Sequence, residues 1–189
     1  MTVHRVTFGF LAAALIALPV SAQATEWSVQ KGSSLLGFVA TITGAARKGG
    51  FTEYDAKITL DPADLAASSV VLEIDVKSAA TGEGQIDSAL PSPDWFSVSE
   101  FPKATFASTE IRHKGGNVYE MDGTLKLRGV EKDLTVPFTL DINGTAAMAR
   151  GEVELVRTDF GVGQGQFASS EQIAASVKVV FEFNATKAE

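Results

Sequence analysis

The chain has 189 residues, of which 16 are basic and 23 acidic, so its formal net charge at pH 7 is −7. An acidic balance with no basic cluster excludes the electrostatic footprint of nucleic-acid binding and disfavours attachment to anionic lipid head groups. The chain contains no cysteine, which excludes disulfides, a thiolate nucleophile and a cysteine-ligated metal.

Residues 1–24, MTVHRVTFGFLAAALIALPVSAQA, predict an exported protein. A short N-terminal region with Arg5 precedes an apolar run from about Phe8 to Val20 and an A-x-A triplet that ends at Ala24. This is the layout of a cleaved signal peptide. A membrane anchor is the alternative, but the run of about thirteen residues falls short of the roughly twenty that span a bilayer. Cleavage after Ala24 leaves a single predicted domain, residues 25–189, whose net charge becomes −8 because only Arg5 is lost.

Alternating apolar and polar residues predict β-strands along most of the mature chain. In SVVLEIDVK, residues 69–77, the apolar face holds Val70, Leu72, Ile74 and Val76. Successive side chains of a strand point to opposite faces, so this period of two is typical of a half-buried strand. The same pattern recurs at residues 38–42, 58–60, 125–127, 132–142 and 176–185.

Turn signals indicate an antiparallel arrangement of these strands. Gly115-Gly116 and Asn143-Gly144 are two-residue hairpin signals between strand-like runs. Pro137 cannot donate a ladder hydrogen bond, and it predicts an edge or a bulge in its strand. Residues 83–90 and 63–67 leave room for one or two short helices. The prediction is therefore one all-β domain of about eight strands, which the alternation alone assigns neither to a barrel nor to a sandwich.

Six stretches of the sequence form a combination whose order and spacing are characteristic of one protein family. They read EWSVQKGSSLLGFVATITG, Gly50-Phe51, SPDWFSVSEFPKATFASTEI, GTLKLRGVEKDLTVPFTL, RTDFGVGQGQF and VKVVFEFNATK. Together they resemble the YceI family of exported lipid-binding proteins over essentially the whole mature chain. The resemblance implies an extended, antiparallel, lipocalin-like β-barrel that holds a long polyisoprenoid chain, such as a quinone-type tail. An eight-stranded barrel is about wide enough for one slender ligand.

Two stretches resemble one branch of that family. TITGAARKGGF and DFGVGQGQF are similar to the branch often found alongside b-type membrane cytochromes such as cytochrome b561. The resemblance therefore implies a membrane b-type cytochrome as a candidate partner. Ile42 stands where the family often carries a histidine at the end of its first long strand.

Residues of one parity in each predicted strand, the odd- or the even-numbered ones, point to the apolar, inward side. These residues of inward parity are expected to line the barrel and bind the lipid. Arg157 continues the parity of Val153 and Leu155, and we expect its guanidinium to pair with the Asp159 carboxylate at the barrel mouth. This predicted ion pair is either purely structural or also contacts the polar head of the lipid. The ligand-binding candidates are Phe38, Ala40, Ile42, Ile58, Val70, Leu72, Ile74, Leu125, Leu127, Phe138, Leu140, Val153, Leu155, Arg157, Val179 and Phe181.

Other motifs are expected to be architectural. A glycine-rich loop that binds a nucleotide is followed by a helix, and no helical pattern follows residue 165. The glycines of residues 161–165 are therefore expected to turn the chain at a barrel end. Trp95-Phe96 and Phe101-Pro102 are expected to plug one barrel end or to form a hydrophobic lip. His113 lies alone in a predicted turn, so no histidine cluster with metal-ligand spacing exists in the mature chain.

The predicted function is that of a periplasmic protein that binds an isoprenoid lipid, either a polyisoprenoid or a quinone-like molecule, and catalyses nothing. No metal or organic cofactor and no nucleic-acid partner are expected, whereas a bound isoprenoid lipid is. One rival is a stress-related interaction partner of a b-type membrane cytochrome, with the lipid as structural filler. A second rival, a lipid hydrolase, lacks a nucleophile–base constellation. The oligomeric state stays open, with a homodimer among the options.

Overall fold

The computed structural model describes residues 25–188, so the predicted signal peptide lies outside the described residues and stays a prediction. The helical elements of the described residues are α1 (Gly84–Ala89) and the 3-10 turns η1 (Lys31–Ser33), η2 (Leu65–Ala67), η3 (Val76–Ser78), η4 (Arg157–Phe160) and η5 (Gly165–Phe167). The strands are β1 (Glu26–Val29), β2 (Leu35–Ile42), β3 (Ala45–Phe51), β4 (Tyr54–Thr59), β5 (Ser69–Asp75), β6 (Ala79–Ala80), β7 (Lys103–Gly115), β8 (Val118–Leu127), β9 (Val130–Asn143), β10 (Ala146–Val156) and β11 (Ile173–Lys187).

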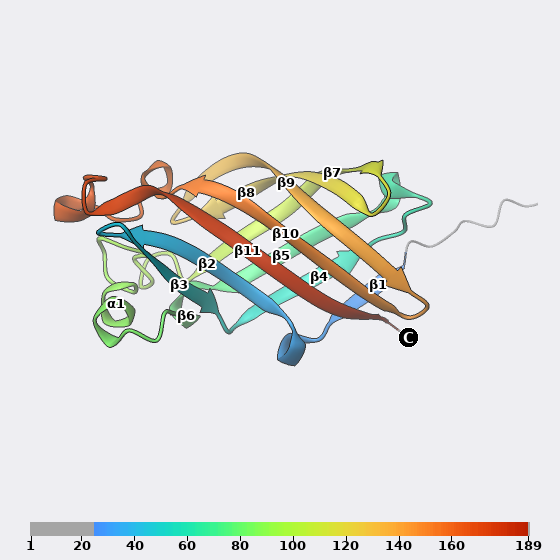
Figure 1. Cartoon of the computed structure of the whole chain (residues 1–189), viewed down its shortest axis with the longest axis horizontal. Coiled ribbons are helices and arrows are strands. Elements are labelled where there is room, and N and C mark those ends of the chain that lie inside the picture. The colour runs from blue at the N-terminus through green and yellow to red at the C-terminus, as the bar shows by residue number, and fades with distance from the viewer. Residues whose placement is uncertain (1–24, 189) are drawn as a thin grey trace, which may run out of the picture.

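The strands form one antiparallel sheet that closes on itself (Figure 1). Their order is β1-β4-β5-β7-β8-β9-β10-β11, and β1 also pairs with β11, which completes a ring of eight strands. The long strand β11 makes this closure possible, because residues 185–187 pair with β1 whereas residues 173–182 pair with β2. Strands β2, β3 and β6 thus extend the sheet beyond the ring. Of the two architectures left open, the chain adopts the lipocalin-like barrel.

The turn signals are confirmed. Gly115-Gly116 joins β7 to β8, and Asn143-Gly144 joins β9 to β10. The helix expected at residues 83–90 is α1, while residues 63–67 contain only the 3-10 turn η2. Pro137 lies just beyond the last paired residues of β9 and β10, Phe138 and Gly151, so β9 has an edge there as expected.

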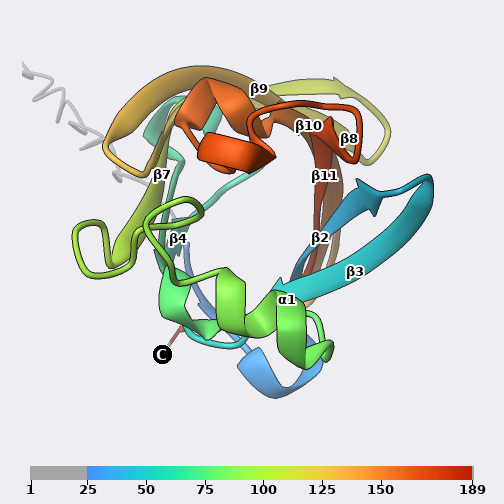
Figure 2. The same cartoon turned by 90° about the vertical axis from the view of Figure 1, so that its left-hand side faces the viewer.

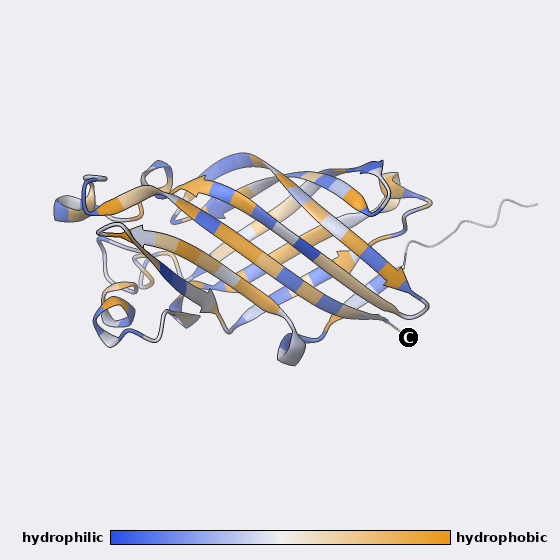
Figure 3. Cartoon of the chain, viewed as in Figure 1, coloured by the Kyte–Doolittle hydropathy of each residue, from blue (hydrophilic) through white to orange (hydrophobic). Residues whose placement is uncertain are grey.

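Apolar and polar residues alternate along the strands, so that one face of each strand is apolar. Figure 3 shows this alternation as orange and blue residues along β10 and β11. In β5, Leu72 and Ile74 are buried and Glu73 is exposed. Two details differ from the expected pattern. β5 ends at Asp75, whose side chain accepts a hydrogen bond from the Lys77 backbone N–H, so Val76 is buried in η3 and not in a strand. Ile142, on the inward parity of β9, is 39% exposed near the hairpin tip.

Strand β7 is the main element that alternation did not predict. Its register against β8 shifts between Ser108 and Glu110, which marks an irregularity in the ladder. An extra residue in one strand exchanges its two faces from that point onward. Phe106 and Ile111 are accordingly both buried although their numbers differ in parity.

One end of the barrel carries most of the irregular structure. Figure 2 looks at this end, where α1, the segment that follows it and the η4–η5 segment lie across the ring of strands. Backbone hydrogen bonds join the two segments, because the N–H groups of Gly163 and Gln164 both donate to the Asp94 carbonyl oxygen. We call this the α1 end.

Candidate functional site

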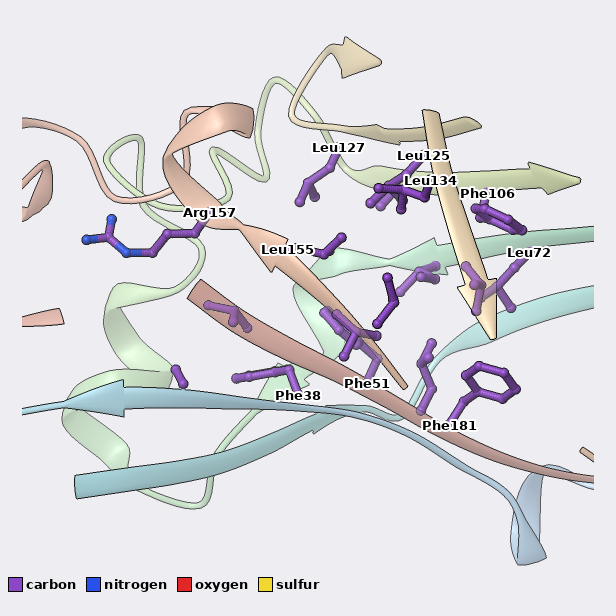
Figure 4. A pocket seen from close by; sticks show the side chains of 18 of the residues that line it. Phe38, Phe51, Leu72, Phe106, Leu125, Leu127, Leu134, Leu155, Arg157 and Phe181 are labelled. Carbon is purple, nitrogen blue, oxygen red and sulfur yellow. The ribbon is translucent and has the colours of Figure 1, made fainter. Parts of the chain in front are cut away.

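The barrel encloses a cavity of about 730 Å³ whose wall is made almost entirely of apolar side chains. Figure 4 labels several of these apolar side chains, including Phe38, Phe51, Leu72, Phe106 and Phe181, which come from strands far apart in the sequence. They converge because each strand turns its apolar face toward the same axis. All sixteen candidates selected by parity lie in this wall, whereas their binding of a lipid stays a prediction.

The wall also contains residues outside the candidate set. Val136, Phe183 and Ala185 lie on inward parity and belong with the candidates, whereas Phe106 lies in the unpredicted strand β7. Phe51 is the last residue of β3. Others come from turns and from α1, where the period of two does not apply: Leu60, Ile86, Ala89, Leu90, Phe160, Val162 and Phe167. Their apolar character was the one signal available in the sequence.

Trp95 and Phe96 both lie in the cavity wall. The Phe96 ring is 6.2 Å from that of Phe51 and the residue is 9% exposed, and the Trp95 ring is 5.2 Å from that of Phe167. These contacts support the plug, since both rings pack inside the barrel end. Phe101 is not in the wall, and it packs instead over the backbone of Gly129.

The predicted ion pair between Arg157 and Asp159 is wrong. Asp159 is exposed and pairs with Lys132, whose Nζ lies 2.8 Å from Oδ2. Arg157 is 5% exposed, and its guanidinium donates only to backbone carbonyl oxygens. Residue 157 opens η4, and the turn carries the Asp159 side chain outward although the two residues share strand parity. A period of two therefore ceases to apply at the point where the strand ends.

Five carbonyl oxygens surround the Arg157 guanidinium. Nε donates to Ala174 at 3.0 Å, Nη1 to Val162 and Gly163 at 2.9 and 3.3 Å, and Nη2 to Ser169 and Ile173 at 3.2 and 2.8 Å. Because a guanidinium has five N–H groups, this set uses all of them. Burial lowers the pKa of Arg157 from its usual value, but an arginine stays protonated in proteins. Arg157 thus holds the η4–η5 segment together.

The glycines of this segment turn the chain at the barrel end, as expected. Gly161, Gly163 and Gly165 have φ angles of 68°, 81° and 56°, a region in which other residues are strained. Gly163 also lies against Arg157, because a β-carbon there would overlap Nη1. The Gly163 backbone can approach the guanidinium this closely only because it carries no side chain.

Five polar residues interrupt the apolar wall, and four of them come from β3 and the region of α1. Arg47 on β3 pairs with Glu83, the residue before α1, at 3.0 Å between Nε and Oε1. Thr81 donates its hydroxyl to Asp87 at 2.7 Å, and this bond holds the pKa of the Asp87 carboxyl below its usual value. The exposed Gln85 is the fourth. The fifth is Arg157, so the polar part of the wall lies at the α1 end.

Within residues 25–188, no group of three or more histidine, aspartate or glutamate side chains could hold a metal ion. His113 lies at the β7–β8 turn, where its Nε2 is 2.9 Å from the Gly116 carbonyl oxygen. In the same part of the chain, no helix has both the length and the apolar character needed to cross a membrane.

Comparison with known proteins gives consistent matches. A family model for the YceI-like domain matches residues 27–185. A UPF0312 protein of Vibrio cholerae is 31% identical over 159 residues, which cover 79% of this chain and 84% of that protein. The crystal structure of Burkholderia cenocepacia BcnA superposes with a TM-score of 0.82 at 31% identity, covering 84% of this chain and 100% of that one. A polyisoprenoid binding domain from Saccharophagus degradans, implicated in plant cell wall breakdown, shares the fold with a TM-score of 0.69 at 16% identity, covering 87% and 99%.

Proposed function

Because this chain belongs to the YceI-like domain family, we propose that it is an exported binding protein that holds one isoprenoid lipid, polyisoprenoid or quinone-like, inside its barrel. The cavity carries this proposal. Its apolar wall, contributed by strands, turns and α1, surrounds a volume of about 730 Å³. Transfer of a hydrocarbon chain from water into such a wall contributes roughly 0.8 kcal/mol per buried methylene. A long branched chain therefore gains affinity from its length, with no need for a charged anchor.

The comparisons support an isoprenoid as the ligand. The Saccharophagus degradans domain, described as polyisoprenoid binding, has the same fold. Catalysis is not part of the proposal, since the five polar residues of the wall include no histidine, and the one hydroxyl among them, that of Thr81, donates to an Asp87 carboxylate whose lowered pKa makes it a weak base.

Organic extraction of the purified, full-length gene product followed by mass spectrometry tests the proposal. We expect about one isoprenoid molecule per protein, released when the barrel unfolds. Recovery of no isoprenoid from a host that makes isoprenoids, or of another lipid class at full occupancy, would contradict it. Retention of the lipid in a stable complex with a b-type membrane cytochrome would favour the rival function, in which the lipid is structural.

Export is tested by the N-terminus of the mature protein. Cleavage after the A-x-A triplet leaves Thr25 as the first residue, and we propose that this form is soluble in the periplasm. N-terminal sequencing after cell fractionation measures both properties. A membrane-bound protein that begins at Met1 would show that the leader is retained as an anchor.

A further inference from the structure

One edge of β3 is free over most of its length. Residues 45–50 of β3 pair with β2 on one side, whereas on the other side β6 pairs only with Gly50 and Phe51. Figure 2 shows the β2–β3 hairpin projecting from the ring of strands. Within the described residues, the segment from Ala45 to Gly49 therefore lacks a strand neighbour on that side. We call this side the free edge of β3.

The geometry of the hairpin decides which backbone groups point to the free edge. Both residues of the turn at 43–44 have positive φ angles, as a two-residue hairpin requires, so the closing pair of Ile42 and Ala45 is hydrogen-bonded. Hydrogen-bonded and non-hydrogen-bonded pairs alternate along an antiparallel ladder. Ala46 and Lys48 therefore belong to non-hydrogen-bonded pairs, and their N–H and C=O groups point away from β2.

The free edge is positively charged, in contrast to the chain as a whole. β2 and β3 contain no acidic residue, and their charged residues are Arg47 and Lys48, whereas the whole chain has a net charge of −7. Lys48 is exposed and forms no ion pair within residues 25–188. Arg47 points to the opposite face of the sheet, where it pairs with Glu83 at 3.0 Å. An exposed cation on an acidic protein favours an acidic partner at this edge.

A second copy of the chain fits the free edge poorly. Pairing of two β3 strands would bring the Arg47 and Lys48 side chains of both copies together, and like charges opposite each other destabilise a sheet. Lysine commonly protects edge strands from self-association in this way. The same two cations would stabilise a strand that carries carboxylates, because cross-strand neighbours on one face interact directly.

We infer that the free edge of β3 docks an extended acidic segment of a partner protein, which joins the sheet as an antiparallel strand. The segment's backbone bonds with Ala46 and Lys48. Successive side chains of a strand point to opposite faces, so two adjacent acidic residues of the segment lie beside Lys48 on the outer face and Arg47 on the inner face. The inference goes beyond the proposed function, because it concerns a protein partner and not the lipid.

A matched pair of peptides tests the docking. One is a short fluorescent peptide of alternating valine and threonine with a central Glu-Asp pair, and the other carries Gln-Asn in its place. Fluorescence anisotropy with the purified full-length gene product should give a dissociation constant below about 1 mM for the acidic peptide, at least about tenfold below that of the neutral one. Equal affinities, or no binding of the acidic peptide at about 1 mM, overturn the inference.

Hydrogen exchange locates the bound peptide. The amides of Ala46 and Lys48 should exchange more slowly in the complex, because their N–H groups then donate to the added strand. Protection at other residues alone would place the peptide elsewhere and overturn the inference. Slow exchange of these two amides in a dimer of the free protein would assign the free edge to a second copy instead.

Lys48→Glu tests the charge of the free edge. The reversal should weaken binding of the acidic peptide about tenfold or more, because attraction becomes repulsion. Lys57→Glu is the matched control, since Lys57 is exposed on β4 and its reversal changes the net charge equally. Equal losses in the two variants would show that net charge alone governs binding, which removes the role of the edge.

Ala46→Pro tests the backbone contacts. Proline removes the N–H group that points to the free edge, and edge strands tolerate it at such a position. Binding of the acidic peptide should weaken several-fold, while slow exchange of the Arg47 amide, which bonds with β2, shows that the hairpin is intact. Unchanged binding would mean that charge alone holds the peptide and would overturn the added strand. If the hairpin is lost, exchange at Ala46 and Lys48 in the wild-type complex decides the question.

Discussion

The backbone of Gly163 passes so close to the Arg157 guanidinium that no side chain fits between them, and its carbonyl oxygen accepts a hydrogen bond from Nη1 at 3.3 Å. Gly163 also has a φ angle of 81°. The glycine is therefore required twice, once for backbone conformation and once for space. This relationship locates the structural centre of the η4–η5 segment, which closes part of the α1 end.

Gly163→Ala should destabilise the protein through both requirements. The positive φ angle costs roughly 1–2 kcal/mol for an alanine, and the overlap with Arg157 adds about 1–3 kcal/mol. Gly144→Ala is the control, because Gly144 has a φ angle of 63° but open space around its β-carbon position. Urea unfolding measures both variants. Equal losses would mean that the Arg157 side chain moves aside without cost.

Arg157→Ala should cost on the order of 3 kcal/mol, because five carbonyl oxygens lose their donors. Asp159→Ala should cost less than about 1 kcal/mol, since it removes only the exposed pair with Lys132. The double variant should be additive within about 0.5 kcal/mol, as for sites that do not interact. A clear departure from additivity in a double-mutant cycle would restore the coupling that the sequence suggested.

Leu72→Gln should reduce the lipid retained by the purified protein. Leu72 lies in the cavity wall, where an amide without an assured partner costs roughly 1–3 kcal/mol. Glu73→Gln is the control in the same strand, because Glu73 faces outward and pairs with Lys103 at the surface. Lipid is measured by extraction at matched concentrations of folded protein. Equal retention in the two variants would remove β5 from the binding site.

The pair of Arg112 and Asp122 predicts a pH-dependent contribution to stability. Hydrogen bonds from Arg112 and Thr135 lower the pKa of Asp122 from 3.8 to about 2. A carboxyl whose pKa is lower in the folded state stabilises that state above its unfolded pKa, and this stabilisation is lost as the pH falls from about 3.8 to about 2. Thermal unfolding across this window should show a smaller pH dependence for Asp122→Asn than for the wild type. An unchanged slope would place the acid sensitivity in other carboxylates.

Local patterns in the sequence were sufficient for most of the barrel strands, with β7 as the main exception, and for much of the cavity wall. Side chains alternate within a strand whatever its neighbours are, so inward parity at Leu72, Phe138 or Val179 could be assigned without knowing which strands pair. The hairpin at Asn143-Gly144 and the edge at Pro137 depend on local backbone preferences in the same way. These features make up most of the ring.

Contacts between distant segments could be decided only by the tertiary structure. Parity could not show that β11 pairs with β1 at one end and with β2 at the other, because closure depends on how the whole sheet twists and staggers. Nor could it assign acceptors to Arg157, since strand periodicity ends where η4 begins and the carbonyl groups come from residues 162–174. The sequence by itself thus determined which faces of the strands are apolar. The tertiary structure decided how the barrel closes and which carbonyl groups surround Arg157, because both depend on segments that meet only after the chain has folded.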